Sequence, residues 1–377
     1  MKKTIGVVFG GRSVEHEISI LSCMQVLKAI DYEKYDVIPI YLDKNNSFYV
    51  GPDFDKLETF QKSKFKKYEV LLKSSEKNQI KLIGLKPLLP RKYRKPIDCI
   101  LAVVHGAGVE DGTLAGVFNL LGVPYTASDI LPASISQDKI IMKKLLACEN
   151  IPIIPYEYFN KDEWINQRRE CLNKIEKLGY PVIIKPARLG SSIGISKASS
   201  PNELINSLSL AFEFDKRVVI EKTLTNYREF NCAIFSSQSL EIISDIEEVV
   251  TSSDFLTYED KYAKKEHNLP LRIIPAEINE QLVDEIKTLT SKINRLILNK
   301  GVSRIDFLYC LDDKKLYVNE INTIPGSLAF YLFDDFKLDF KNLITTLIEH
   351  AIKDKLLENV RTSFETNILN ISQILKK

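Results

Sequence analysis

The sequence predicts a hairpin in its C-terminal third that brings two carboxylates and an amide together. If the turn is centred on Asp313, Asp306 lies opposite Glu320. The same register sets Arg304 opposite Asn322, and the two-residue period of a strand puts Asn322 on the face of Glu320. Opposed carboxylates repel and call for a compensating cation, and three oxygen ligands suit Mg²⁺ supplied with nucleotide phosphates. The alternative is a solvated hairpin face, which the apolar residues that alternate with these side chains disfavour.

A loop rich in glycine and serine follows a predicted strand that ends in Lys185. Residues 190–194 read Gly-Ser-Ser-Ile-Gly, and a loop of small residues with free backbone N–H groups can close over phosphate oxygens. The spacing is not that of a P-loop. The same residues match the G-x-S-x-G nucleophile elbow of hydrolases, but an elbow needs the strand to run straight into the turn, whereas residues 185–189 intervene here. An ordinary surface turn is the third interpretation.

A second strand end also carries polar residues. The apolar strand that ends in Glu221 and Lys222 leads into a polar hinge, with Glu229 a few residues later. Hinge backbone and a carboxylate could bind an adenine and a ribose. An ordinary strand end is an equally simple interpretation of this segment alone.

Two further turns point into one predicted crevice near the N-terminus. Gly10-Gly11 and then Glu15 follow the first strand, where a carboxylate could meet a substrate cation beyond the strand ends, unless this is a plain strand-to-helix connection. Residues 105–112 follow another strand and would project into the same crevice. They miss the G-x-G-x-x-G spacing by one residue, which excludes a dinucleotide fingerprint.

The elements that must position these residues alternate between strand and helix over the first 130 residues, which predicts a parallel sheet. Phe54 to Lys95 is lysine-rich and is predicted to be a peripheral insertion. We expect three units, with a lid in the third because residues 251–271 are polar and too long for a simple connection. The expected units are an N-terminal α/β domain at 1–130, a small α+β domain at 131–215 and a C-terminal domain at 216–377.

Composition and charge narrow the class of protein. At 377 residues the chain has room for two or three domains, and no segment approaches the roughly 18 apolar residues of a membrane span. A formal net charge of +2 gives no general attraction to nucleic acid or anionic lipid, so we expect neither as a partner. The 6 cysteines include no C-x-x-C pair, the 4 histidines have no zinc-ligand spacing, and no signal peptide is evident. We therefore expect a cytoplasmic protein with reduced thiols.

These segments together resemble the D-alanine:D-alanine ligase family of the ATP-grasp superfamily. The resemblance implies an α/β and α+β protein with a three-domain ATP-grasp fold and an N-terminal parallel-sheet domain. It also implies ATP between the second and third domains, two small D-amino or hydroxy acids nearby, and dimers as a common assembly. The motifs that carry it occur in order over most of the chain, at residues 10–19, 105–112, 138–139, 185–194, 221–222, 304–306 and 319–326.

Matching motifs imply a role for individual residues of the nucleotide site. The residues expected to contact the ATP phosphates are Lys139, Lys185 and Lys261. Those expected to hold adenine and ribose are Glu221, Lys222, Leu224 and Glu229. Those expected to bind Mg²⁺, with Mn²⁺ as an alternative ion, are Asp306, Glu320 and Asn322.

The resemblance also implies roles in the amino-acid site. Glu15, helped by His105, would hold the ammonium of the first D-alanine. Ser191 and Tyr262 would join Glu15 in a hydrogen-bonded network that fastens the lid. Such a lid would keep water from the intermediate.

The implied reaction has two steps. A first D-alanine carboxylate would attack the γ-phosphate to give an acyl phosphate, with the lysines and Mg²⁺ neutralising charge. The amine of a second D-alanine would then attack the activated carbonyl, and Arg304 with the backbone N–H of Gly326 would stabilise the oxyanion. The product would be D-alanyl-D-alanine for peptidoglycan precursors.

One departure from the family pattern leaves the second substrate open. After Pro325-Gly326 the family usually has small hydroxyl residues toward the second substrate, whereas residues 327–332 read Ser-Leu-Ala-Phe-Tyr-Leu here, so Ser327 is the substrate-binding candidate. Lys261-Tyr262 resembles dipeptide-forming members, but relatives that use D-lactate carry a histidine in this loop, and His267 lies five residues later. D-Lactate or D-serine as second substrate, and a non-catalytic ligand-binding homologue, are the alternatives.

Overall fold

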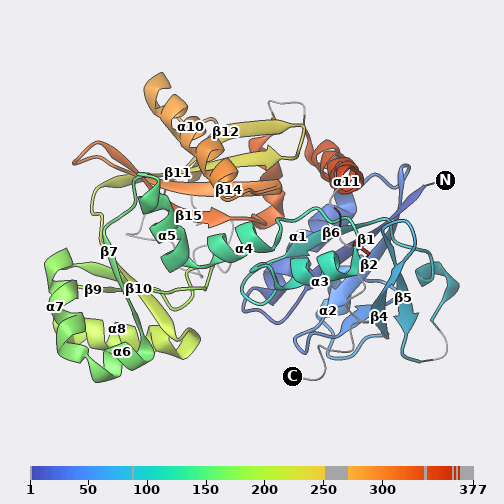
Figure 1. The fold of residues 1–377 in the computed structure, drawn as a ribbon, viewed down its shortest axis with the longest axis horizontal. Coiled ribbons are helices and arrows are strands. Elements are labelled where there is room, and N and C mark those ends of the chain that lie inside the picture. Colours follow the sequence, from blue (N-terminus) through green and yellow to red (C-terminus); the bar gives the residue numbers. More distant parts are fainter. Residues whose placement is uncertain are drawn as a thin grey trace.

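The described strands of this computed structural model form three sheets (Figure 1). Figure 1 shows the first sheet in blue at the right, the second in green at the lower left and the third in yellow and orange at the top. The predicted lid falls almost entirely on residues 251–270, which lie outside the described residues. Lys261, Tyr262 and His267 are among them. The residues that the structure describes are 2–86, 89–250, 271–334, 338–358, 361, 364 and 365.

The first sheet is mixed, with its parallel part at one end. β1, β2 and β6 pair in parallel, which confirms the parallel sheet predicted from the alternation of strands and helices. β3, β4 and β5 continue the sheet with antiparallel pairing, so the predicted insertion at 54–95 supplies the edge of the sheet through β4 and β5. The strands, in spatial order, are β5 (Gln79–Gly84), β4 (Tyr68–Ser75), β3 (Phe48–Val50), β2 (Tyr35–Leu42), β1 (Lys3–Gly10) and β6 (Cys99–Val104).

The turn after β1 depends on glycine. Gly10 and Gly11 have φ angles of +92° and +103°, and a Cβ at Gly10 would collide with the carbonyl oxygen of Leu42 on β2. This sharp turn lets helix α1 (His16–Ala29) start close to the end of β1. Glu15 therefore lies at the N-terminal end of α1, beyond the carboxyl edge of the parallel strands.

The last helix in the described part of the chain covers the first sheet. α11 (Phe340–Leu357) contacts both β6 and α1. Its residues Leu343, Ile344, Leu347 and Ile348 join the same hydrophobic core as Ile5 on β1. The C-terminal segment thus ties the third unit back to the first, which the sequence analysis did not predict.

The second sheet has the order β7-β10-β8-β9 and is antiparallel. Three helices, α6 (Lys161–Asn166), α7 and α8, share its core. β10 pairs with β7 and β8, although the predicted boundary at 215 had placed this strand in the third unit. Its elements are β7 (Tyr156–Asn160), β8 (Val182–Pro186), β9 (Ser196–Ala198), β10 (Arg217–Lys222), α7 (Arg168–Leu178) and α8 (Pro201–Phe214).

The third sheet contains the predicted hairpin. β14 and β15 pair so that Asp306 opposes Glu320 and Arg304 opposes Asn322, which confirms the predicted register at the candidate site. A bulge after Asp306 shifts the pairing by one residue toward the turn. The elements, in spatial order, are β13 (Leu271–Ile273), β12 (Glu241–Val250), β11 (Tyr227–Ser236), β14 (Gly301–Cys310) and β15 (Lys315–Asn322), with α10 (Glu280–Leu296) packed on one face.

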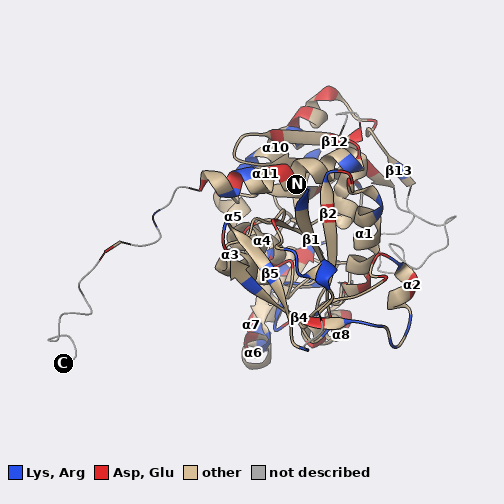
Figure 2. Ribbon diagram, turned by 90° about the vertical axis from the view of Figure 1, so that its right-hand side faces the viewer, with Lys and Arg blue, Asp and Glu red and all other residues tan. Residues whose placement is uncertain are grey.

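Short helices complete the described chain. Figure 2 shows basic and acidic residues intermixed along the ribbon, in keeping with the small net charge. None of the helices in the described ranges combines the length and apolar character needed to cross a bilayer. The remaining elements are α2 (Leu57–Phe60), η1 (Arg91–Tyr93), α3 (Thr113–Leu121), α4 (Ile130–Gln137), α5 (Lys139–Cys148), α6 (Lys161–Asn166) and η3 (Gly326–Leu332).

Candidate active site

The described residues that are predicted to bind a nucleotide line one cleft between the second and third sheets. β8 and β10 of the second sheet contribute Lys185 and Glu221, and α5 contributes Lys139. The hairpin of the third sheet contributes the two opposed carboxylates. The predicted residues that line this cleft are Lys139, Lys185, Glu221, Lys222, Leu224, Glu229, Asp306 and Glu320.

A second cavity, of about 780 Å³, adjoins this cleft on the side of the first sheet. Lys139, Gly190, Glu229, Asp306 and Glu320 border both spaces. The two predicted sites are therefore directly adjacent. The other predicted residues that line the second cavity are Glu15, His105, Ser191, Arg304, Asn322, Gly326 and Ser327.

Glu221 is a buried carboxylate held between two lysines. Its Oε1 lies 2.9 Å from Nζ of Lys143, and its Oε2 lies 2.7 Å from Nζ of Lys185. Burial alone would raise the pKa of Glu221, but the charges of Lys143 and Lys185 lower it to about 2. The carboxylate therefore stays ionised at neutral pH.

Lys143 was missed by the sequence analysis. Its side chain is fully buried, and burial lowers its pKa although Glu221 opposes the shift. The signal that could have found it is its spacing, because Lys139 and Lys143 are four residues apart on α5 and therefore share a helix face.

Lys139 stands at the start of α5, where its ammonium meets both sides of the cleft. The Asp138 carboxylate caps the helix by accepting N–H bonds from Ile140 and Ile141, each 3.1 Å long. Lys139 donates to the carbonyl of Leu189 at 2.8 Å and to Glu320 Oε1 at 2.9 Å. The cation thus connects the glycine-serine loop to the hairpin.

The hairpin carboxylate Asp306 is bound by a guanidinium. Arg304 donates through Nε and Nη2 to the two Asp306 oxygens, at 2.6 and 2.8 Å, and Asn322 Nδ2 donates to Asp306 Oδ2 at 3.0 Å. Burial would lower the pKa of Arg304, but the Asp306 charge raises it well above its usual value. Two carboxylates and an amide form a hard oxygen donor set that fits Mg²⁺ once phosphate oxygens complete the shell.

The glycine-serine loop reaches the N-terminal end of α1. Ser191 Oγ donates a hydrogen bond to Glu15 Oε1. Gly106 and Gly190 leave room for the carboxyl group, since a Cβ on them would lie 2.5 and 3.0 Å from Glu15 Oε2. The predicted contact between Ser191 and Glu15 therefore exists between two loops that are far apart in the sequence.

The course of this loop excludes the hydrolase interpretation. After β8 ends at Pro186, residues 190–194 lead into the short strand β9. A nucleophile elbow requires a helix directly after the serine. Residues 191–194 instead form turns, and the next helix begins only at Pro201, after β9.

A buried histidine and a buried glutamate complete the wall of the second cavity. His105 Nε2 lies 2.9 Å from Ser22 Oγ, and burial lowers its pKa to about 4, so the imidazole is neutral at pH 7. Glu110 accepts N–H bonds from Gly106 at 3.0 Å and from Ile324 at 2.9 Å. Burial and the nearby Glu15 charge raise its pKa to about 8. Glu110 lies in the 105–112 motif, but the sequence analysis gave it no role.

The segment after the hairpin turns sharply at the cavity. A Cβ at Gly326 would meet nothing within 4 Å, so the Gly326 backbone borders open space. The next three residues have left-handed φ angles between 49° and 54°. Ser327 Oγ donates to Gln25 Oε1 on α1 at 2.5 Å.

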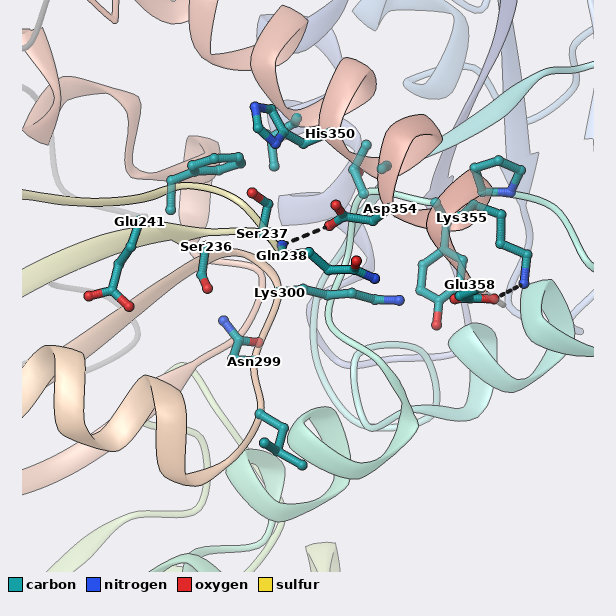
Figure 3. Close-up of a pocket in the computed structure, with 18 of the residues that line it drawn as sticks. Ser236, Ser237, Gln238, Glu241, Asn299, Lys300, His350, Asp354, Lys355 and Glu358 are labelled. Carbon is teal, nitrogen blue, oxygen red and sulfur yellow. Dashed lines mark hydrogen bonds and ion pairs between the residues drawn. The ribbon is translucent and has the colours of Figure 1, made fainter. Parts of the chain in front are cut away.

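A separate cavity of about 490 Å³ lies where α11 meets the end of β11 and the end of α10 (Figure 3). Figure 3 shows the backbone N–H of Gln238 bonded to Asp354, at 3.2 Å, and the ion pair of Lys355 with Glu358. Among the described residues, its lining shares none with the two spaces above. It therefore lies apart from the candidate active site.

Two family models together match most of the chain. Residues 4–128 match the model described as D-ala D-ala ligase N-terminus, and residues 145–349 match the model described as D-ala D-ala ligase C-terminus. A D-alanine–D-alanine ligase of Thermosipho melanesiensis is 39% identical over 97% of this chain and 98% of the relative. One of Prochlorococcus marinus is 37% identical over 93% of this chain and 99% of the relative.

Solved structures agree with this result. The VanG D-Ala:D-Ser ligase from Enterococcus faecalis superposes with a TM-score of 0.78 at 29% identity, over 93% of this chain and 100% of that one. The D-alanine–D-alanine ligase from Coxiella burnetii gives 0.77 at 24% identity, over 94% and 95% of the two chains, which bears on the fold alone.

Proposed function

The chain belongs to the D-alanine–D-alanine ligase family, and we propose that it joins two D-alanines into D-alanyl-D-alanine at the expense of ATP. The product would serve the synthesis of peptidoglycan precursors in the cytoplasm. The observation that carries the proposal is that the two spaces are adjacent. A cleft with cations for phosphates meets, at Asp306 and Glu320, a cavity that is lined by Glu15 and Arg304.

We assign the nucleotide side as follows. The ATP phosphates contact Lys139 and Lys185, and the resemblance adds Lys261. Adenine and ribose lie against Glu221, Lys222, Leu224 and Glu229. This assignment is supported by the common cleft that all the described members line.

Asp306, Glu320 and Asn322 would hold Mg²⁺, or Mn²⁺ in its place. The ion supplies charge neutralisation for the phosphoryl group that is transferred. The donor set supports this assignment. Each of its two carboxylates is paired with a cation in the present arrangement, Asp306 with Arg304 and Glu320 with Lys139.

The first half-reaction needs one D-alanine held with its carboxylate toward the nucleotide. Glu15 binds the ammonium, and the neutral His105 adds no charge that would repel it. The substrate carboxylate then attacks the γ-phosphorus, giving D-alanyl phosphate and ADP. Ser191, with Tyr262 implied by the resemblance, fastens the lid that keeps water out.

In the second half-reaction the amine of another D-alanine attacks the acyl carbonyl, and phosphate leaves. Arg304 and the Gly326 N–H are assigned to the oxyanion, because both border the second cavity. The alternative product is D-alanyl-D-serine, which the likeness to the VanG D-Ala:D-Ser ligase keeps as the second candidate. We also propose a homodimer, on the resemblance alone.

The test is phosphate release from Mg-ATP with D-alanine alone, and then with D-alanine plus D-serine, D-lactate or glycine, with products identified by mass. We expect D-alanyl-D-alanine from D-alanine alone. A product that forms only with another acceptor would overturn the assignment of the second substrate. Absence of phosphate release with every pair would overturn the ligase assignment.

A further inference from the structure

One face of the third sheet lines the second cavity from edge to edge. Asp306 on β14 pairs with Asn231 on β11, Asn231 pairs with Glu247 on β12, and Val249 on β12 pairs with Arg272 on β13. Directly paired residues share a face, and so do residues two apart on one strand. Arg272 therefore lies on the same face as Asp306, at the opposite edge of the sheet.

The cavity is lined by three described cations, and two of them are already assigned to the reaction. Lys139 is tied to Glu320 and to the loop, with 7% of its side chain exposed. Arg304 is tied to Asp306 through two N–H groups, with 20% exposed. Arg272 has 51% of its side chain exposed. Its guanidinium is the most accessible of these three positive charges.

Arg272 is held in place without using all its donors. Its Nη1 lies 3.1 Å from Oε1 of the fully buried Glu247, and its guanidinium lies 5.2 Å from the ring centre of Tyr331. Glu247 is itself fixed by Asn231 Nδ2 at 2.8 Å and by the Tyr331 hydroxyl at 3.4 Å. A guanidinium has five N–H donors in a planar fork, so one carboxylate contact leaves donors for a second carboxylate.

The serine expected near the second substrate has its donor engaged. Ser327 Oγ donates to Gln25, and a hydroxyl has one hydrogen to donate. The Tyr331 hydroxyl donates its own hydrogen to Glu247, whereas the Arg272 guanidinium beside the Tyr331 ring keeps N–H donors and lies on the same wall of the cavity. A carboxylate in this part of the cavity would meet the Arg272 guanidinium.

We propose that Arg272, supported by Tyr331, binds the carboxylate of the second substrate and so makes a free carboxylate a requirement for the acceptor. The inference rests on the proposed ligase function. An amino-acid acceptor places its amine and its carboxylate on one carbon atom. With the amine directed at the acyl carbonyl beside Arg304, the carboxylate points along the sheet face toward Arg272. Glu247 holds the guanidinium in this orientation.

The test compares R272M with R228M as the matched control. Arg228 pairs with Glu248 and stacks on Phe230, so it has the same kinds of contact as Arg272 but does not line the cavity in the described structure. Acceptors are D-alanine and D-alaninamide, which lacks the carboxylate. Hydroxylamine, which traps the acyl phosphate, reports the first half-reaction separately.

We expect R272M to raise KM for the second D-alanine by roughly 10- to 100-fold, as for loss of a charged hydrogen bond. Hydroxamate formation and the KM for ATP should stay at the wild-type level. The wild-type preference for D-alanine over D-alaninamide should disappear in R272M, remain in R228M and be partly restored in R272K.

An active R272M enzyme with unchanged KM and unchanged acceptor preference would overturn the assignment of Arg272 alone. Equal losses of hydroxamate and dipeptide in R272M would also overturn it, because they would show a general structural effect. If the wild-type protein forms neither hydroxamate nor dipeptide, the proposed function fails, and this inference fails with it.

Discussion

Replacing Lys143 by methionine should weaken both the fold and the nucleotide site. Lys143 and Lys185 share the carboxylate of Glu221, so the three side chains together carry one net positive charge. In K143M, Lys185 alone must neutralise a carboxylate that is 2% exposed. Its charge is then no longer available to a phosphate.

The size of the effect follows from the pKa of Glu221. Lowering this pKa from 4.5 to about 2 corresponds to about 3 kcal/mol of stability at pH 7. Because the folded-state pKa is depressed, this contribution is present above pH 4.5 and is lost as pH falls through about 2. K143M should lose much of it at pH 7, in line with the ~3–5 kcal/mol typical of a broken buried ion pair.

The chain offers a local reporter for this measurement. Trp164 is its single tryptophan and packs in the core of the second sheet, which also contains β10 and Glu221. Urea unfolding followed by Trp164 fluorescence at pH 7 therefore reports the part of the molecule in question. Calorimetric titration with Mg-ATP measures the affinity of the same variants without any need for turnover.

The double variant K143M/E221Q makes the argument refutable. Removing the carboxylate together with Lys143 leaves no unneutralised buried charge, so the free energy of unfolding should partly recover. K144M is the control, since Lys144 is the exposed neighbour on the same helix. Wild-type stability in K143M would refute the reasoning, and so would a double variant no better than K143M.

Three further outcomes are expected. In the wild-type protein the free energy of unfolding should fall as pH rises from 4.5 to about 8, because burial raises the folded-state pKa of Glu110 and its ionised form opposes folding. E110Q should make this fall smaller, and an unchanged slope in urea titrations over this range would contradict the expectation. D306N should reduce phosphate release by at least ~100-fold while the far-ultraviolet circular dichroism is retained, and substantial turnover would remove Asp306 from the site. S191A removes a hydroxyl donor to Glu15 and should lower kcat roughly 10-fold; equal activity of S191A and the wild-type protein would exclude a role for this hydrogen bond.

The parts of the site that the sequence predicted are those governed by local periodicity. The hairpin register placed Asp306 opposite Glu320 because the two-residue period and the turn position determine which side chains face each other. The parallel first sheet followed from alternating elements. The glycine-serine loop was placed correctly after a strand, and its contact with Glu15 required the family resemblance.

The parts that were missed depend on contacts between distant segments. The carboxylate of Glu110 accepts a hydrogen bond from the backbone N–H of Ile324, 214 residues away, and no local pattern encodes this contact. β10 joins the second sheet because both its edges are paired there, which a linear boundary near 215 could not express. α11 buries its apolar face on the first sheet, at the other end of the chain.

Three cations of the site are paired with carboxylates before any substrate is bound. Arg304 pairs with Asp306, Lys139 with Glu320, and Lys185 with Glu221. Each cation in the described part of the chain that is assigned to a phosphate or an oxyanion is thus paired with a carboxylate assigned to the metal or the nucleotide. Substrate binding is therefore an exchange of partners in a largely buried site, which avoids leaving an isolated buried charge at any stage. Arg272 extends the same arrangement to the far end of the cavity, where Glu247 holds it ready for a carboxylate.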